Sequence, residues 1–263
     1  MLIKAAINGG RTKAEHRAVP VSPAEQAAAV AECVKAGAGA IHLHVRCASS
    51  DENLQLEGES LYAKDVAQTL LAVLPVAAKS QIGITTGAWI LRDSTARLEA
   101  VAAWDVLPGF ASVNFSEDGA VDLASLLLSR GVDVEVGLCD ADAADFFLKS
   151  GLVKQQPIES SHMSTSRFIR VLLEPQEQTM ERALESVRGI EKVLDSGAIQ
   201  LPCLLHGTEA TVWPMMDEAI ARGYDVRVGL EDTLLMPDGR IARDNTELIT
   251  EAVRRVGTRS SRQ

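Results

Sequence analysis

Residues 41–46 read Ile-His-Leu-His-Val-Arg, an alternation of apolar and polar side chains with a period of two. In an extended chain this period puts the three apolar residues on one face and His42, His44 and Arg46 on the other. Same-face neighbours lie roughly 7 Å apart at Cα, so both imidazoles can reach one metal ion at about 2 Å each. A pair of hydrogen-bonded core histidines is the alternative, and the H-x-H pattern alone does not separate the two.

A second alternating stretch lies near the C-terminus, where residues 225–232 read Asp-Val-Arg-Val-Gly-Leu-Glu-Asp. The same period places Arg227, Gly229 and Glu231 on one side. Glu231 is the candidate third ligand, since two imidazoles and one carboxylate leave a zinc ion with an open position. Non-haem iron uses a similar set of ligands. Gly229 either leaves room for a ligand beside the metal or serves the packing of the strand.

Strand-like and helix-like segments alternate along the whole chain. We expect strands at 2–8, 41–46, 80–87, 110–115, 132–138, 168–173, 201–206 and 226–231, and helices at 23–36, 59–74, 94–104, 123–129, 141–149, 179–194, 210–222 and 245–256. The 263 residues divided among eight such units give about 33 per unit, which matches an α/β fold of the (β/α)₈ TIM-barrel type in order and length. An open doubly wound sheet is the alternative. We expect a single TIM-barrel domain over 1–263, with 257–263 as a flexible tail.

The barrel strengthens the case for a site, because its active sites lie at the C-terminal ends of the strands and its interior layers come from alternate strands. The second and eighth predicted strands both have even numbers in chain order, so His42 or His44 can share an interior layer of the barrel with Glu231. Arg227 offers a planar fork for a carboxylate or a developing oxyanion, and Asp232 can accept a proton or hold the guanidinium. A purely structural ion pair is the alternative for these two.

Other polar residues near the predicted strand ends are weaker candidates. Glu15 follows a glycine loop and can recognise a cationic group, or it is a solvated acid. Small donors at strand ends can orient a substrate, although each can equally be a satisfied polar residue; they are Thr85, Ser112 and Asn114. Glu135 is a candidate for orienting the inner residues. His206 supports the ligands, faces the substrate or is a hydrogen-bonded structural histidine.

Composition excludes several classes of protein. The formal charge of -10, from 26 basic and 36 acidic residues, argues against broad binding of nucleic acid. With 46% hydrophobic and 24% charged residues, the chain resembles a globular protein. No apolar run approaches the roughly 18 residues of a spanning helix, and the first residues lack the pattern of a signal peptide. We therefore expect a cytoplasmic protein with neither nucleic acid nor membrane as partner.

Four segments in order carry a family resemblance: Asn-Gly-Gly-Arg-Thr-Lys-Ala-Glu at 8–15, His-Leu-His-Val-Arg at 42–46, Leu-His-Gly at 205–207 and Arg-Val-Gly-Leu-Glu-Asp-Thr-Leu at 227–234. With them the chain resembles the β-keto acid cleavage enzymes. The resemblance implies a zinc-dependent barrel that condenses a β-keto acid with acetyl-CoA and then cleaves the product to acetoacetate and a new CoA thioester.

The resemblance also implies roles for single residues. It implies that His42, His44 and Glu231 bind one Zn²⁺ per chain and that Arg227 and Asp232 are the catalytic pair. Substrate contacts fall on Glu15, Thr85, Ala88, Ser112 and Asn114. A homo-oligomer is expected, with a tetramer as one state.

The chain departs from the family pattern in two places. Cys47 follows H-x-H-x-R, where family members often carry aspartate or asparagine, and residues 158–174 match no pattern of the family. The substrate's side chain is therefore left open.

Two further functions stay open on the sequence alone. One is a zinc-dependent aldolase or hydrolase that acts without CoA. The other is a non-catalytic barrel that binds a metal and a small acid. The pairing of Arg227 with Asp232 beside the candidate ligands favours catalysis, since mere binding would not need both.

Overall fold

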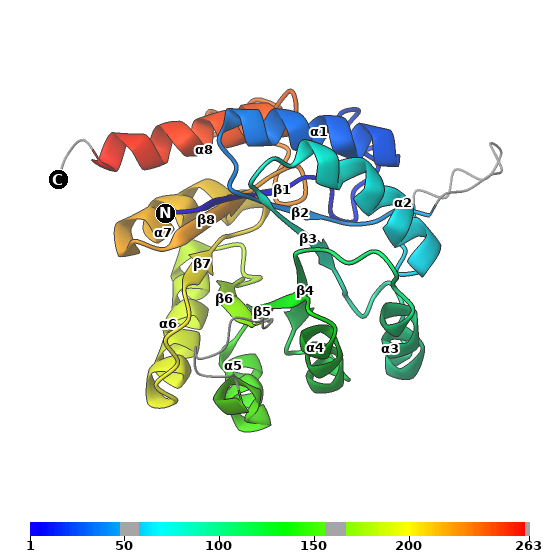
Figure 1. The fold of residues 1–263 in the computed structure, drawn as a ribbon. Helices are drawn as coiled ribbons and strands as arrows, with labels where there is room; N and C mark the ends of the chain where they lie inside the picture. Colours follow the sequence, from blue (N-terminus) through cyan, green and yellow to red (C-terminus); the bar gives the residue numbers. More distant parts are fainter. Residues whose placement is uncertain (48–57, 156–166, 261–263) are drawn as a thin grey trace.

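The computed structural model describes residues 1–47, 58–155 and 167–260. Within these ranges, eight parallel strands close into a barrel in sequential order, and a helix follows each strand (Figure 1). The strands are β1 Ile3–Ala6, β2 Ala40–Leu43, β3 Gln81–Thr85, β4 Phe110–Asn114, β5 Asp133–Leu138, β6 Phe168–Leu173, β7 Cys203–Leu205 and β8 Asp225–Val228. Pairing of β1 with β8, in register Lys4 to Arg227, completes the cylinder. The predicted (β/α)₈ TIM barrel is thereby confirmed over the open sheet.

The helices surround the barrel, and α1, α2 and α8 lie side by side over β1 and β2 (Figure 1). They are α1 Pro23–Ala36, α2 Ala63–Val73, α3 Ser94–Ala102, α4 Ala120–Ser129, α5 Ala141–Ser150, α6 Met180–Ser196, α7 Val212–Arg222 and α8 Asn245–Ser260, with short 3₁₀ turns at Leu74–Val76, Leu152–Gln155 and Glu209–Thr211. Within the described ranges, every helix is too short or too polar to span a lipid bilayer. The last residues of the predicted tail, 261–263, lie outside the described part, whereas 257–260 continue α8.

Helix α1 shows how local sequence sets a boundary. Ser22 caps its start and accepts a hydrogen bond from the amide of Glu25, whose side chain reaches back to the amide of Ser22. Pro23 fills the first helical position, where no amide hydrogen is needed. Gly37 ends the helix at φ 115° in the left-handed region, which glycine adopts at little cost. The predicted bounds of this helix match the observed ones.

Helix α2 begins at Ala63 rather than at residue 59 as predicted. Residues just before it pair with the chain that leaves β2: the amide of Ser60 donates to the carbonyl of Val45 at 2.9 Å, and Arg46 forms an isolated bridge with Glu59. This tertiary pairing overrides the local helix pattern. Glu59 is therefore left outside the helix, near the end of β2.

Strands β2 and β8 are shorter than the alternating sequence predicts, because they end at Leu43 and Val228. Residues 229–232 form a turn in which the amide of Asp232 donates to the carbonyl of Gly229 at 2.9 Å. A Cβ on Gly229 would lie 1.8 Å from the carbonyl oxygen of Ala6. Of the two interpretations of Gly229, the structure supports packing of the β8 end against β1, since only hydrogen fits there.

The apolar core lies between the outer face of the barrel and its helices. Ile41 and Leu43 of β2 and Val30 of α1 belong to it and are fully buried. The interior of the barrel holds charged side chains instead, with Lys4 and Glu135 both 0% exposed. Such charges need partners to be stable in a barrel, and these partners support the site above them.

Candidate metal centre and active site

Two histidines and a glutamate meet at the C-terminal end of the barrel. His42 lies in β2, His44 follows the strand, and Glu231 lies in the turn after β8. His42 Nε2 is 3.1 Å from His44 Nε2. The carboxylate oxygens of Glu231 lie 3.7 Å from the first nitrogen and 3.5 Å from the second. The structure therefore brings together the three residues that the sequence predicts as ligands.

The spacing and chemistry of these atoms fit a divalent metal ion. Tetrahedral ligands about 2 Å from zinc are roughly 3.3 Å apart, close to the observed separations of 3.1 to 3.7 Å. Glu231 Oε2 is buried and has no hydrogen-bond partner among the described residues, a costly state unless a cation takes it. Gly9 makes room for this side chain, since a Cβ there would lie 2.4 Å from Glu231 Cγ. The donor set suits zinc and non-haem iron alike.

Surrounding charges set the protonation of the three residues. Burial opposes the ionised form of Glu231, but Arg227 and both imidazoles hold the pKa of its carboxyl well below the usual value. Burial lowers the pKa of His42. Burial also acts on His44, yet the carboxylates of Glu231 and Glu59 outweigh it and raise the pKa of His44 to about 8. Glu231 is thus an anion and His42 neutral, the forms in which they can coordinate a metal.

His42 is oriented by a chain of buried polar groups that reaches to the bottom of the barrel. Ser112 Oγ donates to Glu135 at 2.8 Å and lies 3.3 Å from His42 Nδ1. Having given its only proton to Glu135, this hydroxyl must accept from His42 Nδ1. Lys4 Nζ donates to the same carboxylate of Glu135 at 2.6 Å. The tautomer fixed in this way leaves Nε2 of His42 free to face the metal position.

His44 is oriented from the opposite side. Its Nδ1 hydrogen-bonds to Glu59, whose two oxygens also accept from Trp89 Nε1 at 3.0 and 2.9 Å. The Trp89 ring stacks on the imidazole at a centroid distance of 6.0 Å. Asn8 fixes the backbone, because its side chain accepts from the amide of His44 and donates to its carbonyl, both at 2.9 Å. Nε2 of His44 is again the nitrogen left for a metal.

Arg227 and Asp232 form a buried pair directly beside the ligands. Arg227 Nη2 donates to Asp232 Oδ1 at 2.7 Å, and Arg227 Nε lies 3.1 and 3.2 Å from the two oxygens. Nη2 also bonds to Glu231. Burial acts against the charge on Arg227, but Asp232 and Glu231 raise its pKa. The guanidinium therefore joins the predicted catalytic pair to the predicted metal ligand.

The residues expected to contact substrate have different surroundings. Ser112 is part of the chain that holds His42. The amide of Ala88 and the side-chain amide of Asn114 both donate to Glu117, at 2.9 Å each. Thr85 is 4% exposed, and its hydroxyl accepts from the amide of Gly87 at 3.3 Å. That these residues contact a substrate stays a prediction.

Glu15 belongs to the loop after β1. One carboxylate oxygen accepts from the amide and hydroxyl of Thr12 at 2.9 and 3.1 Å, and the other lies 3.3 Å from Arg11 Nη1. The bond from the amide of Thr12 is the main cause that lowers the pKa of Glu15. Both oxygens are therefore engaged in holding the loop, and the role of Glu15 toward a substrate also stays a prediction.

Sequence reasoning missed Glu59, Trp89 and Glu174. The sequence pattern predicts a helix that starts at Glu59, and no local pattern links this residue to His44, which lies 15 residues earlier in the chain. Trp89 is 50% exposed, and a lone aromatic in a loop gives no signal. Glu174 directly follows the predicted β6 strand, so its place at a strand end is the one signal that was available.

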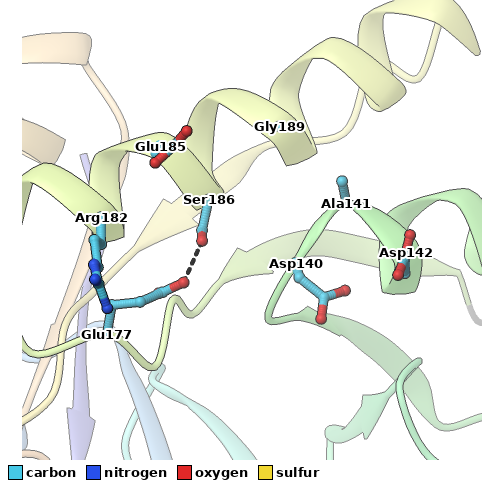
Figure 2. Close-up of a pocket in the computed structure, with 8 residues that line it drawn as sticks. All are labelled: Asp140, Ala141, Asp142, Glu177, Arg182, Glu185, Ser186 and Gly189. Carbon is cyan, nitrogen blue, oxygen red and sulfur yellow. Dashed lines mark hydrogen bonds between the residues drawn. The ribbon is translucent and has the colours of Figure 1, made fainter.

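A separate hollow lies outside the barrel, between the start of α5 and the first half of α6 (Figure 2). Its volume is about 460 Å³ and most of its charged lining is acidic; it is lined by Asp140, Ala141, Asp142, Glu177, Arg182, Glu185, Ser186 and Gly189. On the α6 side of the hollow, Ser186 Oγ donates to Glu177. None of the candidate ligands or catalytic residues lines this hollow.

Known proteins resemble the chain over most of its length. A 3-keto-5-aminohexanoate cleavage enzyme from Fusobacterium nucleatum subsp. nucleatum is 26% identical over 274 residues, which cover 97% of this chain and 90% of the relative.

Among solved structures, ObcA in a binary complex with oxaloacetate has a TM-score of 0.66 at 15% identity. ObcA in a ternary complex with a C4-CoA adduct and oxalate has a TM-score of 0.69 at 16% identity. In both, 92% of this chain is covered but only 64% of the ObcA chain, and at this identity the likeness shows the fold. The model of the β-keto acid cleavage enzyme family matches residues 1–262. The chain therefore belongs to the β-keto acid cleavage enzyme family.

Proposed function

We propose that this protein is a zinc-dependent acyltransferase that exchanges acyl groups between a β-keto acid and acetyl-CoA. The products are acetoacetate and the CoA thioester of the substrate's own acyl group. Membership of the family and the name of the F. nucleatum relative support cleavage of a β-keto acid. The choice of zinc over iron, acetyl-CoA as co-substrate and assembly into a homo-oligomer rest on the family resemblance.

One observation carries the proposal: His42, His44 and Glu231 converge to within 4.8 Å, with the Arg227–Asp232 pair in contact with Glu231. A zinc ion bound by these three residues would supply Lewis-acid polarisation of the keto group. The groups that bind the substrate's carboxylate and move the α-proton come from the chain itself.

Arg227 and Asp232 divide the remaining work. Nη1 of Arg227 has no hydrogen-bond partner among the described residues, so it is available to the substrate's carboxylate. Among the residues that the structure describes, Asp232 Oδ2 accepts a single bond, at 3.2 Å from Arg227 Nε, and it is the oxygen with room for the α-proton. The guanidinium holds the carboxylate in place while the proton moves.

Carbon–carbon bonds are then exchanged in two steps. The deprotonated α-carbon attacks the thioester carbonyl of acetyl-CoA, and the CoA thiolate leaves. The thiolate attacks the original keto carbon, and the bond between that carbon and the α-carbon breaks. The acetoacetate carbanion takes back the proton from Asp232. Atoms balance, since one acyl group has replaced the other on CoA.

The test uses chelator-treated protein, with and without added Zn²⁺, incubated with a panel of β-keto acids and acetyl-CoA. We expect acetoacetate and a new CoA thioester, detected by mass spectrometry, only when zinc, acid and acetyl-CoA are all present. Product without acetyl-CoA would indicate an aldolase or hydrolase instead. Ligand-induced thermal stabilisation without any product would indicate a binding protein.

A matched pair of variants tests the metal assignment. Glu231→Gln should lower activity and zinc affinity by more than about 100-fold, because loss of a ligand exceeds the effect of losing an outer partner. Glu218→Gln changes a glutamate on α7 that pairs with Arg222, and it should leave both values unchanged. Full activity in Glu231→Gln after chelation would contradict the assignment.

A further inference from the structure

Hydrogen-bond acceptors gather beside the Arg227–Asp232 pair, at the ends of β4 to β7. Glu174 directly follows β6, and its amide donates to the carbonyl of Leu138 at 3.0 Å. On the neighbouring strand, a Cβ on Gly137 would lie 2.5 Å from Asn114 Oδ1 and 2.6 Å from Glu174 Oε1. The two oxygens thus lie against the same side of Gly137, where a side chain at residue 137 would collide with both.

The third acceptor is His206, which follows β7. Its Nδ1 lies 3.2 Å from the carbonyl of Gly207; a carbonyl can only accept, so Nδ1 carries the proton and Nε2 is a bare acceptor. The ring is 3% exposed, and Nε2 has no hydrogen-bond partner among the described residues. Nε2 lies 3.7 Å from Glu174 Oε2, which is longer than a hydrogen bond. Burial, reinforced by Arg227, lowers the pKa of His206 to about 4, so the ring is neutral.

Among the described residues, the carboxylate of Glu174, like Nε2 of His206, has no hydrogen-bond donor. Its side chain is 16% exposed, and within the described ranges no donor reaches its carboxylate. Burial raises the pKa of Glu174 to about 7 against the opposing charges of Arg227 and Lys4. A carboxylate and a ring nitrogen left in this state cost free energy that a donor from a ligand would recover.

The side-chain amide of Asn114 presents its oxygen, which is also a hydrogen-bond acceptor. Its Nδ2 is used by Glu117 at 2.9 Å, so the oxygen is what faces Gly137. Glu15, an acid of the loop after β1, has both oxygens engaged by Thr12 and Arg11. Among the described residues, Asn114 and Glu174 beside Gly137 and His206 beside Glu174 therefore offer acceptors from three strand ends.

We propose that Glu174, His206 and Asn114 form the subsite for the substrate's side chain, and that this side chain carries a hydrogen-bond donor, an amine or a hydroxyl. The subsite rests on the proposed function, because its place relative to Arg227 and Asp232 makes it the neighbour of the reacting carboxylate. His206 Nδ1 is 3.7 Å from Asp232 Oδ1. An apolar side chain would give these acceptors no donor, and a carboxylate would be repelled by the ionised form of Glu174.

The test compares six-carbon β-keto acids that carry hydrogen, a hydroxyl or an amino group on one of the two carbons farthest from the carboxylate. Binding to the zinc-loaded protein is measured by calorimetry without acetyl-CoA, and kcat/KM is measured with it. At least one donor-bearing acid should be favoured on the order of 10- to 100-fold over the unsubstituted acid. Whether the hydroxyl or the amine is best separates the two kinds of donor. A preference for the unsubstituted acid would overturn the proposal.

Variants identify the residues behind the preference. Glu174→Gln should reduce the ratio of kcat/KM for the donor-bearing acid to kcat/KM for the unsubstituted acid by about 10-fold. His206→Ala should reduce this ratio too. The control is Glu177→Gln, which changes an acid that lines the outer hollow (Figure 2). It should keep the ratio within about twofold of wild type. An equal loss on all substrates in Glu174→Gln would contradict the subsite. If no acid yields acetoacetate, the proposed function fails, while the calorimetric preference of the wild-type protein still decides the subsite.

Discussion

Replacing Glu135 should destabilise the barrel from its centre. Its fully buried carboxylate accepts from Lys4 Nζ at 2.6 Å and from Ser112 Oγ at 2.8 Å, and it lies 3.4 Å from Arg170 Nε. In Glu135→Gln, Lys4 and Arg170 keep their charges in the interior without their shared anion. Breaking a buried pair by removing one partner costs about 3–5 kcal/mol, and we expect a loss of this size in the free energy of unfolding.

The pKa of Glu135 leads to the same magnitude. Burial opposes the ionised form, but Lys4 and Arg170 lower the pKa of Glu135 from 4.5 to about 2. At 1.36 kcal/mol per pKa unit, this shift corresponds to about 3 kcal/mol of stability in favour of the ionised form. Because the folded pKa is the lower one, this stability is fully present above pH 4.5 and is lost as the pH falls toward 2.

Ionisation of Lys4 changes the free energy of unfolding in a second, alkaline pH range. Burial lowers the pKa of Lys4 from 10.5 to about 8, against the attraction of Glu135. Between these two values the unfolded chain binds more protons than the folded one, so the contribution of Lys4 makes stability rise with pH. Lys4→Met should lack this rise, and Glu135→Gln should be less harmful at about pH 9 than at about pH 6, since Lys4 can then lose its proton.

The assay is urea unfolding of metal-free protein for wild type, Glu135→Gln, Lys4→Met and the double variant. The double variant should lose less than the sum of the two single losses, because neither charge is then left without the other. A loss below about 1 kcal/mol in Glu135→Gln, or full additivity in the double variant, would refute the reasoning.

Two further changes test single contacts. Glu59→Gln removes the charge that holds His44 Nδ1 and should lower zinc affinity roughly 10- to 100-fold, measured by competition with a chromophoric chelator; unchanged affinity would contradict this role. Gly229→Ala places a methyl 1.8 Å from the carbonyl oxygen of Ala6 and should cost about 3 kcal/mol or more of unfolding free energy. Gly257→Ala, where a methyl meets nothing within 4 Å, is its control, and a stable but inactive Gly229→Ala would favour the alternative in which Gly229 leaves room for a ligand.

Local signals were strong enough to predict the barrel and the bounds of α1. The cap formed by Ser22 and Glu25 and the glycine at 37 act through neighbours in the chain, so sequence alone determines them. The candidate ligands were also predictable, because H-x-H and the 225–232 stretch each lie within one short segment. Glu231, however, reaches His42 from a turn and not from an extended strand.

Other parts of the site depend on contacts that no local pattern contains. Glu59 meets His44 only because residues 58–60 pair with the chain after β2, which also moves the start of α2. The acceptors Asn114, Glu174 and His206 come from three different strand ends. Their meeting depends on the curvature of the closed sheet and on a missing side chain at Gly137. Such convergence is a property of the tertiary structure.

Glu231, the candidate third metal ligand, is synthesised long after the two candidate histidines. The two imidazoles are synthesised in β2 and directly after it, whereas the carboxylate follows only after β8, the strand that pairs with β1 to close the barrel. A nascent chain therefore offers an ion two nitrogens and no third donor from this cluster. Tight binding of an ion by all three residues would become possible only once the barrel has closed, so a bound ion would stabilise the closed barrel across the contact of β1 with β8 and not the unfinished chain.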